Sequence, residues 1–155
     1  MARKSAGILL WKRERGSMLV LLVHPGGPFW KNKDAGAWSI PKGEYDDDEE
    51  SLAAAKREFA EELGPLPAGE VMPLGEVRQK AGKVVTAFAL EGEFDCANFK
   101  CNSFEIEWPP KSGRRQRFPE AEEARWMTIA EARRMMLTSQ LPLLEALEAK
   151  FKADH

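Results

Sequence analysis

The segment from Gly43 to Gly64 constrains this chain more than any other part of its sequence. It begins in an acidic run, contains the strongly helix-favouring Ala53-Ala54-Ala55, and ends at Gly64-Pro65, a pair that stops helices. Asp47, with Glu50 three residues later, predicts a capping box at the helix start. Four apolar residues recur at helical spacing and form one face of the helix: Leu52, Ala55, Phe59 and Leu63. An amphipathic helix of this kind has to pack against another layer of structure.

The same helix carries three glutamates, Glu58, Glu61 and Glu62, within five consecutive positions. Successive residues rotate by about 100° around a helix, which places these carboxylates together on one flank of the apolar face. Crowded like charges destabilise a helix unless a cation lies between them, and hard divalent cations prefer oxygen ligands. The pattern therefore predicts a magnesium-type site. The alternative is a solvated acidic surface that Lys56 and Arg57 partly neutralise.

The full spacing of the segment, G-x5-E-x7-R-E-(apolar)-x-E-E-x-G, resembles the signature of the Nudix hydrolases. The chain carries every fixed position of that signature: Gly43, Glu49, Arg57, Glu58, Glu61, Glu62 and Gly64. The position after Gly64 is usually aliphatic in the family and is Pro65 here, which we expect to alter the helix exit more than the chemistry. The motif covers 22 residues, and the order of the predicted elements extends the resemblance over most of the chain.

The resemblance implies a metal-dependent pyrophosphohydrolase that cleaves a nucleoside diphosphate-linked substrate by attack of water at phosphorus, with Mg²⁺ or Mn²⁺ as cofactor. Carried over by position, four residues resemble the family's metal ligands: the carbonyl of Gly43 and the carboxylates of Glu58, Glu61 and Glu62. Glu58 is the best candidate to accept the proton of the attacking water. Arg57 and Glu49 resemble the ion pair that orients the helix. The candidate catalytic residues are therefore Glu49, Arg57, Glu58, Glu61 and Glu62.

Residues outside the motif are candidates for substrate binding. Trp38 to Gly43 has the form W-x-x-P-K-G, which resembles Nudix members acting on dinucleoside polyphosphates or on RNA 5′ ends. Lys42 is then either a phosphate ligand or simply part of a strand-to-loop turn. Trp30 lies in a polar loop and is a candidate to stack on a base, whereas Trp38 is more typical of a core.

A basic loop and several glutamates complete the set of candidates. Three arginines in the loop are suited to distal phosphates by their guanidinium forks, or else form a solvated basic surface: Arg114, Arg115 and Arg117. Many family members use a further glutamate outside the motif. Here the candidates are Glu105, Glu107, Glu120 and Glu123.

The predicted elements run strands, one helix, more strands and then helices, which indicates an α+β chain rather than a regular βαβ alternation. We expect strands at 5–12, 18–24, 37–40, 71–79, 83–91, 103–108 and 123–127. The first two strands are joined by a turn at 13–17, and 71–79 and 83–91 form a hairpin that turns at Ala81-Gly82; a further turn is expected at 41–43 and a basic loop at 109–117. Two further helices are expected at 128–137 and 141–151. The resemblance implies a Nudix-type α/β/α sandwich with a mixed central sheet, in a single domain over residues 1–155.

Composition restricts the partners of the chain. A net charge of −2 at pH 7 gives no global attraction to nucleic acid or to an anionic membrane, so an anionic substrate needs a local cation. No apolar run approaches the roughly 20 residues that span a bilayer. With Cys96 and Cys101 as reduced thiols, we expect a cytoplasmic protein. The expected partner is a small-molecule nucleotide, without membrane or long nucleic acid, and a homodimer is an option that the resemblance leaves open.

Three other functions remain as alternatives. A Nudix module that senses a nucleotide without cleaving it needs no cluster of carboxylates, so the intact motif argues against it. An RNA 5′-end pyrophosphohydrolase fits the W-x-x-P-K-G form equally well. An isoprenyl diphosphate isomerase on the same scaffold is disfavoured because the chain is short for it and has no obvious catalytic cysteine in its core.

Overall fold

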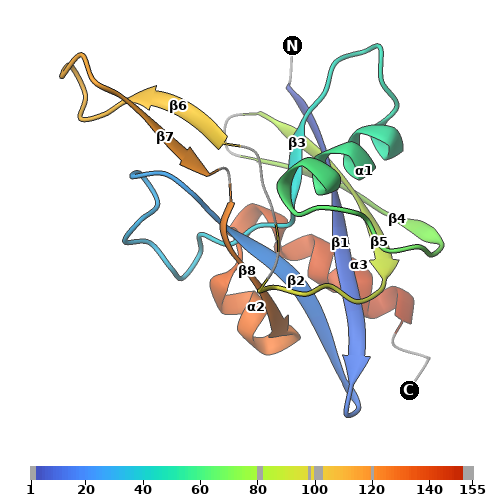
Figure 1. Cartoon of the computed structure of the whole chain (residues 1–155). Helices are drawn as coiled ribbons and strands as arrows, with labels where there is room; N and C mark the ends of the chain where they lie inside the picture. The colour runs from blue at the N-terminus through green and yellow to red at the C-terminus, as the bar shows by residue number, and fades with distance from the viewer. Residues whose placement is uncertain (1–2, 80–81, 98, 100–102, 120, 152–155) are drawn as a thin grey trace.

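A computed structural model describes residues 3–79, 82–97, 99, 103–119 and 121–151 (Figure 1). Its strands are β1 (Lys4–Glu14), β2 (Ser17–Pro25), β3 (Lys42–Glu44), β4 (Val71–Arg78), β5 (Val84–Glu91), β6 (Ser103–Glu107), β7 (Arg115–Pro119) and β8 (Ala121–Thr128). Its helices are α1 (Ser51–Glu62), α2 (Ile129–Met135), the short 3-10 helix η1 (Thr138–Gln140) and α3 (Leu141–Phe151).

A six-stranded sheet forms the middle layer, in the order β4-β5-β1-β2-β8, with β3 paired to β1 beside β2. The pair β1–β5 is parallel, and the pairs of β1 with β2 and β3, β2 with β8, and β4 with β5 are antiparallel. The mixed sheet expected from the sequence is therefore confirmed. Strands β6 and β7 form a separate two-stranded hairpin that projects from one side of the molecule (Figure 1).

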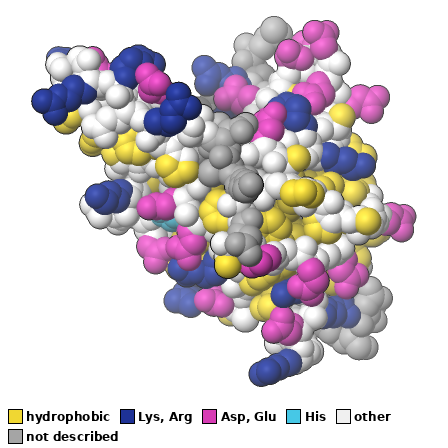
Figure 2. All heavy atoms as spheres, viewed as in Figure 1, with side chains coloured by type: hydrophobic (Ala, Val, Ile, Leu, Met, Phe, Trp, Pro, Cys, Tyr) yellow, Lys and Arg dark blue, Asp and Glu magenta, His cyan; other side chains and the backbone are white. Residues whose placement is uncertain are grey.

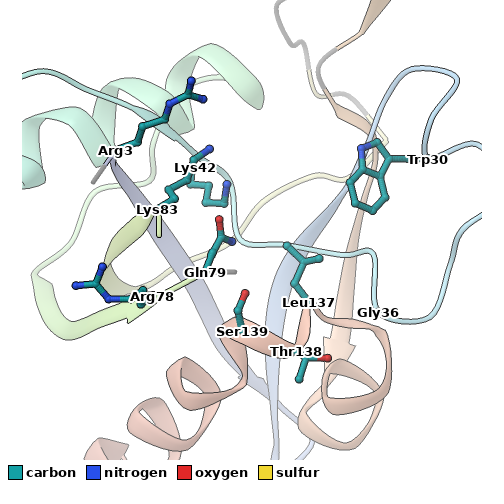
Figure 3. Close-up of a pocket in the computed structure, with 10 residues that line it drawn as sticks. All are labelled: Arg3, Trp30, Gly36, Lys42, Arg78, Gln79, Lys83, Leu137, Thr138 and Ser139. Carbon is teal, nitrogen blue, oxygen red and sulfur yellow. The ribbon is translucent and has the colours of Figure 1, made fainter. Parts of the chain in front are cut away.

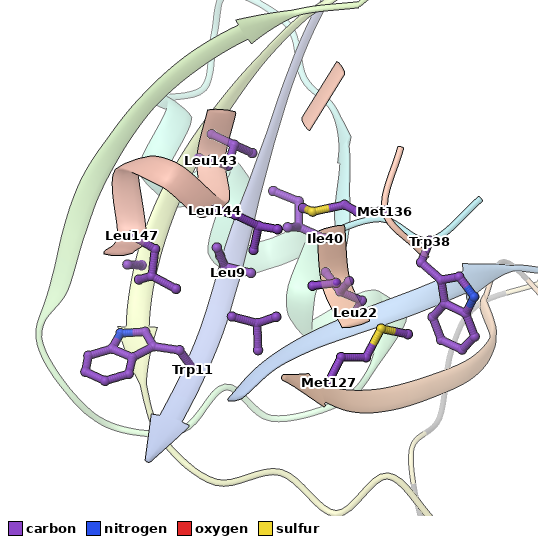
Figure 4. Packing of buried hydrophobic residues seen from close by; sticks show 14 of the residues in the cluster. Leu9, Trp11, Leu22, Trp38, Ile40, Met127, Met136, Leu143, Leu144 and Leu147 are labelled. Carbon is purple, nitrogen blue, oxygen red and sulfur yellow. The ribbon is translucent and has the colours of Figure 1, made fainter. Parts of the chain in front are cut away.

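Helices cover both faces of the sheet, and β1 shows how. Its residues Ala6, Ile8 and Leu10 belong to the apolar cluster that contains Phe59 of α1. The alternate residues Leu9 and Trp11 belong to the cluster on the other face, with Leu144 and Leu147 of α3 (Figure 4). Because side chains alternate across a strand, this division places α1 on one face and α2 and α3 on the other. The α/β/α sandwich is confirmed.

The approach to α1 differs from the sequence prediction. Residues 37–40 make single bridges, Ser39 with Val23 and Trp38 with Met136, and are not a strand. The strand instead lies at 42–44, where a turn was expected. The segment 37–40 cannot continue as a strand because it is held between β2 and the end of α2: the Trp38 N–H donates to the Met135 carbonyl at 2.9 Å, and Leu137 N–H donates to the Trp38 carbonyl at 2.8 Å.

The predicted capping box of α1 is wrong. The helix begins after Glu50, and no side chain caps it. Asp47 is instead drawn to Lys4 of β1, with which it forms an ion pair, while Asp46 accepts a hydrogen bond from the Asp48 N–H at 3.1 Å. The end of the helix follows the prediction, since α1 stops at Glu62 and Gly64 takes a positive φ of 116°.

The predicted basic loop at 109–117 is also partly wrong, because its last three residues belong to strand β7. Cross-strand partners explain the pairing: Phe104 lies opposite Phe118, and Glu105 lies opposite Arg117. Elsewhere the predictions hold, including the β1–β2 and β4–β5 hairpins, β8, α3 and the capping box of Thr128 and Glu131 at the start of α2. The turn residue Ala81 and Cys101 lie outside the described residues. None of the described helices has the length and apolarity that a bilayer crossing requires.

A buried glutamine at the end of η1 binds the segment 37–40, which leads into β3. Gln140 is fully buried; its Oε1 accepts from the Ile40 N–H at 3.1 Å, and its Nε2 donates to the Ser39 hydroxyl at 3.0 Å. Two buried polar groups of the segment 37–40 thus bind one side chain, and for the Ile40 N–H it is the acceptor that burial requires.

We expect Gln140→Ala to lower the free energy of unfolding by about 2–4 kcal/mol, because it opens a cavity and leaves the buried Ile40 N–H without its acceptor. The Ser39 hydroxyl loses one contact and keeps its hydrogen bond to the Ile40 carbonyl at 2.7 Å. Urea denaturation of the purified variant measures the change. Ser39→Ala, which removes only one of the two contacts, should cost clearly less. Equal costs for the two variants would contradict this account of Gln140.

Candidate active site

The carboxylate of Glu58 lies directly against strand β3. Glu58 is buried, with 8% of its surface exposed, and a Cβ added at Gly43 would lie 1.8 Å from its Oε1. No side chain other than hydrogen fits at position 43 while Glu58 keeps this position. The glycine that opens the motif therefore has a steric reason, which is the close approach of α1 to β3.

Arg57 binds three of the four glutamates of the motif, Glu49, Glu58 and Glu61. Its Nε donates to Glu49 Oε2 at 2.9 Å and its Nη2 to Glu49 Oε1 at 2.8 Å, a bidentate pair. Its Nη1 donates to Glu58 Oε2 at 2.5 Å and to both oxygens of Glu61 at 3.3 Å. Hydrogen bonding to Glu49, opposed by burial and reinforced by Glu58 and Glu61, raises the pKa of Arg57 far above its ordinary value. Hydrogen bonding to Arg57 in turn lowers the pKa of Glu49.

The residues present fit a divalent cation in kind. Within the described part of the chain, no three Asp, Glu, His or Cys side chains are gathered closely enough to hold an ion as they stand. The guanidinium of Arg57 lies among the carboxylates of Glu49, Glu58 and Glu61. Glu58 and Glu61 are hard oxygen donors on neighbouring turns of α1, and the Glu58 side chain is only 11% exposed. An ion would draw the carboxylates of Glu58 and Glu61 away from the guanidinium.

A large pocket lies on the side of β3 that faces away from α1. Its volume is about 1200 Å³, and the residues that line it are Arg3, Trp30, Gly36, Lys42, Arg78, Gln79, Lys83, Leu137, Thr138 and Ser139. Figure 3 shows Lys42, Lys83 and Gln79 reaching into the same space, with Trp30 across from them. The structure thus brings together two of the five residues that the sequence suggested for substrate binding, Trp30 and Lys42.

Alternation along β3 connects the pocket to α1. Gly43 is paired with Ala6, which faces α1, whereas Lys42 is paired with Gly7 on the opposite face. Burial, and then the positive charge of Lys83, lower the pKa of Lys42, while Glu62, Glu44 and Glu58 act in the opposite direction. Lys42 therefore lies within electrostatic reach of both the pocket cations and the motif carboxylates.

The loop that carries Trp30 is held in place by its own contacts. His24, at the end of β2, is buried, and its Nε2 contacts the Lys33 carbonyl. The Lys33 N–H donates to the Trp30 carbonyl at 3.0 Å, and the Trp38 indole donates to Asp34 Oδ1 at 2.8 Å. Lys33 Nζ lies 5.4 Å from the centre of the Trp30 ring. These contacts support a structural role for His24 and position Trp30 at the pocket.

The three arginines of the basic segment lie elsewhere. Arg114 precedes β7, and Arg115 and Arg117 lie within it, on the projecting hairpin where Figure 2 shows basic side chains. Arg115 donates to Glu105 at 2.7 Å, and Arg117 lies 3.6 Å from the same carboxylate. None of the three lines the pocket described above.

The glutamates suggested outside the motif also have local partners. Glu107 accepts from the Lys111 and Gly113 N–H groups at 3.0 and 3.1 Å, which fixes the turn of the β6–β7 hairpin. Glu123 pairs with Arg125 at 3.0 Å. Glu105 pairs with Arg115, and Glu120 lies outside the described residues.

The pocket contains residues that the sequence analysis did not suggest: Arg3, Arg78, Gln79 and Lys83. A signal was present for part of this set, because Arg78 and Lys83 flank the turn of a predicted hairpin and so lie near each other. Their position beside Lys42 depends on the parallel pairing of β1 with β5, in which Lys4 lies opposite Val84. No local pattern reveals that pairing.

Comparison with known proteins gives a consistent result. The model of the NUDIX domain family matches residues 1–147. None of the curated proteins matches the chain. Among solved structures, an Ap4A hydrolase of C. elegans in a binary complex is similar at 18% identity and a TM-score of 0.67, covering 96% of this chain and 98% of that chain.

Two further solved structures are similar over nearly the whole chain. The NUDIX domain of Shewanella oneidensis NrtR complexed with ADP ribose has 19% identity and a TM-score of 0.67, covering 97% of this chain and 88% of that chain. A mutT/nudix family protein from Listeria innocua has 19% identity and a TM-score of 0.64, covering 98% and 95%. At such identities the similarity is one of fold.

We expect Arg57→Ala to lower the free energy of unfolding by about 1–2 kcal/mol, since it leaves the buried Glu58 without its guanidinium; the 38% exposure of Arg57 keeps the cost moderate. Urea denaturation at low ionic strength measures it. Arg57→Lys should recover little, because an ammonium cannot make the bidentate pair with Glu49. The exposed Arg134→Ala serves as control, and a loss of the same size there would contradict the prediction.

Proposed function

The chain belongs to the NUDIX family of phosphoanhydride hydrolases, and from this premise we propose that it is a metal-dependent pyrophosphohydrolase. Its substrate is a nucleoside diphosphate-linked compound, most simply a nucleotide or dinucleoside polyphosphate. The observation that carries the proposal is the buried Glu58 carboxylate, held between Gly43 of β3 and the guanidinium of Arg57.

Each residue of the motif then has a physical role. Glu58 accepts the proton of the attacking water, because it is the most buried carboxylate of the cluster and is fixed in direction by Arg57. Glu58, Glu61, Glu62 and the Gly43 carbonyl hold Mg²⁺ or Mn²⁺. When bound, the ion neutralises the diphosphate and lowers the pKa of water. Glu49 keeps Arg57 in place, so that the carboxylates remain on one flank of α1.

The pocket supplies the binding of the rest of the substrate. Lys42 contacts phosphate, since it lies between the pocket and the motif carboxylates. Trp30 stacks on a base from the opposite wall, as aromatic faces do with nucleobases. Two structural neighbours support a nucleotide as the substrate, because one is an Ap4A hydrolase and the other is complexed with ADP ribose.

Glutamine substitutions test the assigned carboxylates. We expect Glu58→Gln to reduce kcat by about 10²-fold or more, because the amide keeps the shape of the side chain and cannot accept the proton. Glu62→Gln should also reduce kcat through a weakened ion site. The assay measures phosphate-containing products from diadenosine tetraphosphate and ADP-ribose with Mg²⁺. Glu145→Gln, on α3 across the sheet, is the control; unchanged turnover in Glu58→Gln would overturn its assigned role.

Metal removal tests the cofactor. Dialysis against EDTA should abolish turnover, and Mg²⁺ or Mn²⁺ should restore it and raise Tm by binding the native state. Gly43→Ala should weaken the response to metal at least tenfold, because its methyl group displaces Glu58. Gly16→Ala is the matched control: its φ of 82° makes alanine costly by about 1–2 kcal/mol, yet nothing lies within 4 Å of the new Cβ. Full activity after EDTA treatment would disprove metal dependence.

A further inference from the structure

The pocket is strongly basic. The described residues that line it include four cations, Arg3, Lys42, Arg78 and Lys83, and no Asp or Glu. The chain as a whole carries a net charge of −2, so this concentration is local. A concave surface of one charge sign focuses the field and favours a ligand of the opposite sign.

Three strand ends produce this concentration. The Val84 N–H donates to the Arg3 carbonyl at 2.8 Å, which places Arg3 beside the start of β5 and next to Lys83. Arg78 is paired with the same Val84 from the other side, at the end of β4. Lys42 begins β3, on the β1 edge opposite β5. Backbone pairing therefore brings these residues to one end of the sheet. In Figure 3 the Arg3 and Arg78 side chains point away from Lys42 and Lys83, so a ligand would have to draw their guanidiniums toward it.

Neutralisation of these cations is incomplete. Glu44 of β3 lies 3.4 Å from Lys83 Nζ and 4.0 Å from Arg3 Nη1, and its side chain is 52% exposed. One exposed carboxylate thus serves two cations, and ion pairs of this kind are weak and easily exchanged. Arg78 donates to the Gly82 carbonyl at 3.4 Å, a long contact that a stronger acceptor would replace.

We propose that Arg3, Arg78 and Lys83 form a second phosphate subsite, which binds phosphate groups beyond the diphosphate that is cleaved. The substrate class is therefore a polyphosphate with additional phosphates on the pocket side of Lys42, rather than a diphosphate ending in a neutral group. This inference rests on the proposed function, in which Lys42 contacts phosphate and the α1 carboxylates hold the ion. The extra phosphate is either internal, as in a dinucleoside polyphosphate, or terminal, as in a nucleoside tetraphosphate.

Substrate comparison tests the subsite. Arg78→Ala and Lys83→Ala should each lower kcat/KM for diadenosine tetraphosphate about tenfold, the effect of one charge-assisted contact. For ADP-ribose, which has only two phosphates, the same variants should change kcat/KM less than twofold. Adenosine 5′-tetraphosphate in parallel distinguishes a terminal from an internal phosphate by which substrate is affected more. Arg134→Ala, on α2, should affect none of them. Equal losses for tetraphosphate and ADP-ribose would overturn the proposal.

Direct binding separates this inference from the proposed function. Isothermal titration with inorganic tripolyphosphate in EDTA should show affinity that falls about tenfold in Lys83→Ala. Glu44→Gln should tighten it severalfold, because both of its cations are released. A structural role of the Glu44–Lys83 pair predicts no tightening, and that outcome would overturn the subsite. If the wild type cleaves no substrate, the proposed function fails while the titration still decides whether phosphate binds here.

Discussion

Strand β1 is the constraint on which the rest of the structure depends. Its residues from Ser5 to Trp11 are buried on both faces, and it pairs with β2, β3 and β5. A strand in that position fixes the direction of its neighbours' side chains, because cross-strand partners share a face. Gly43 therefore opens toward α1 while Lys42 points away from it. One residue step along β3 separates the acidic half of the site from the basic half.

The acidic half shows how a helix tolerates crowded carboxylates. Arg57 binds Glu49, Glu58 and Glu61 at once, which offsets the like-charge repulsion that would otherwise destabilise α1. The same arrangement explains why a helix with this charge can pack its other side, including the fully buried Phe59, against the sheet. The same residues thus stabilise the helix when no ion is bound and supply oxygen donors for an ion. Glu58 and Glu61 can bind either the Arg57 guanidinium or a metal ion.

Local patterns in the sequence were sufficient for α1, the two long hairpins and the mixed sheet, and for the motif residues around Gly43. They failed where distant partners decide. Asp47 leaves its expected capping position for Lys4, and residues 37–40 are bound by Val23 and the end of α2 instead of extending. The pocket was predictable only in part for the same reason. Trp30 and Lys42 could be selected by residue type and sequence context. Arg3 becomes relevant only through the parallel register of β1 and β5.

The separation of charge across β3 also bears on how a substrate would lie. Anionic groups are repelled by Glu58, Glu61 and Glu62 and attracted by Lys42 and Lys83, so a phosphate chain is most stable with its bulk on the basic side. Only a divalent cation reverses the sign of the field at the acidic side. An ion would therefore draw one phosphate of the chain over β3 toward Glu58 while the remainder stays with the cations. The geometry of a single short strand thus links ion binding to the position of the bond that is cleaved.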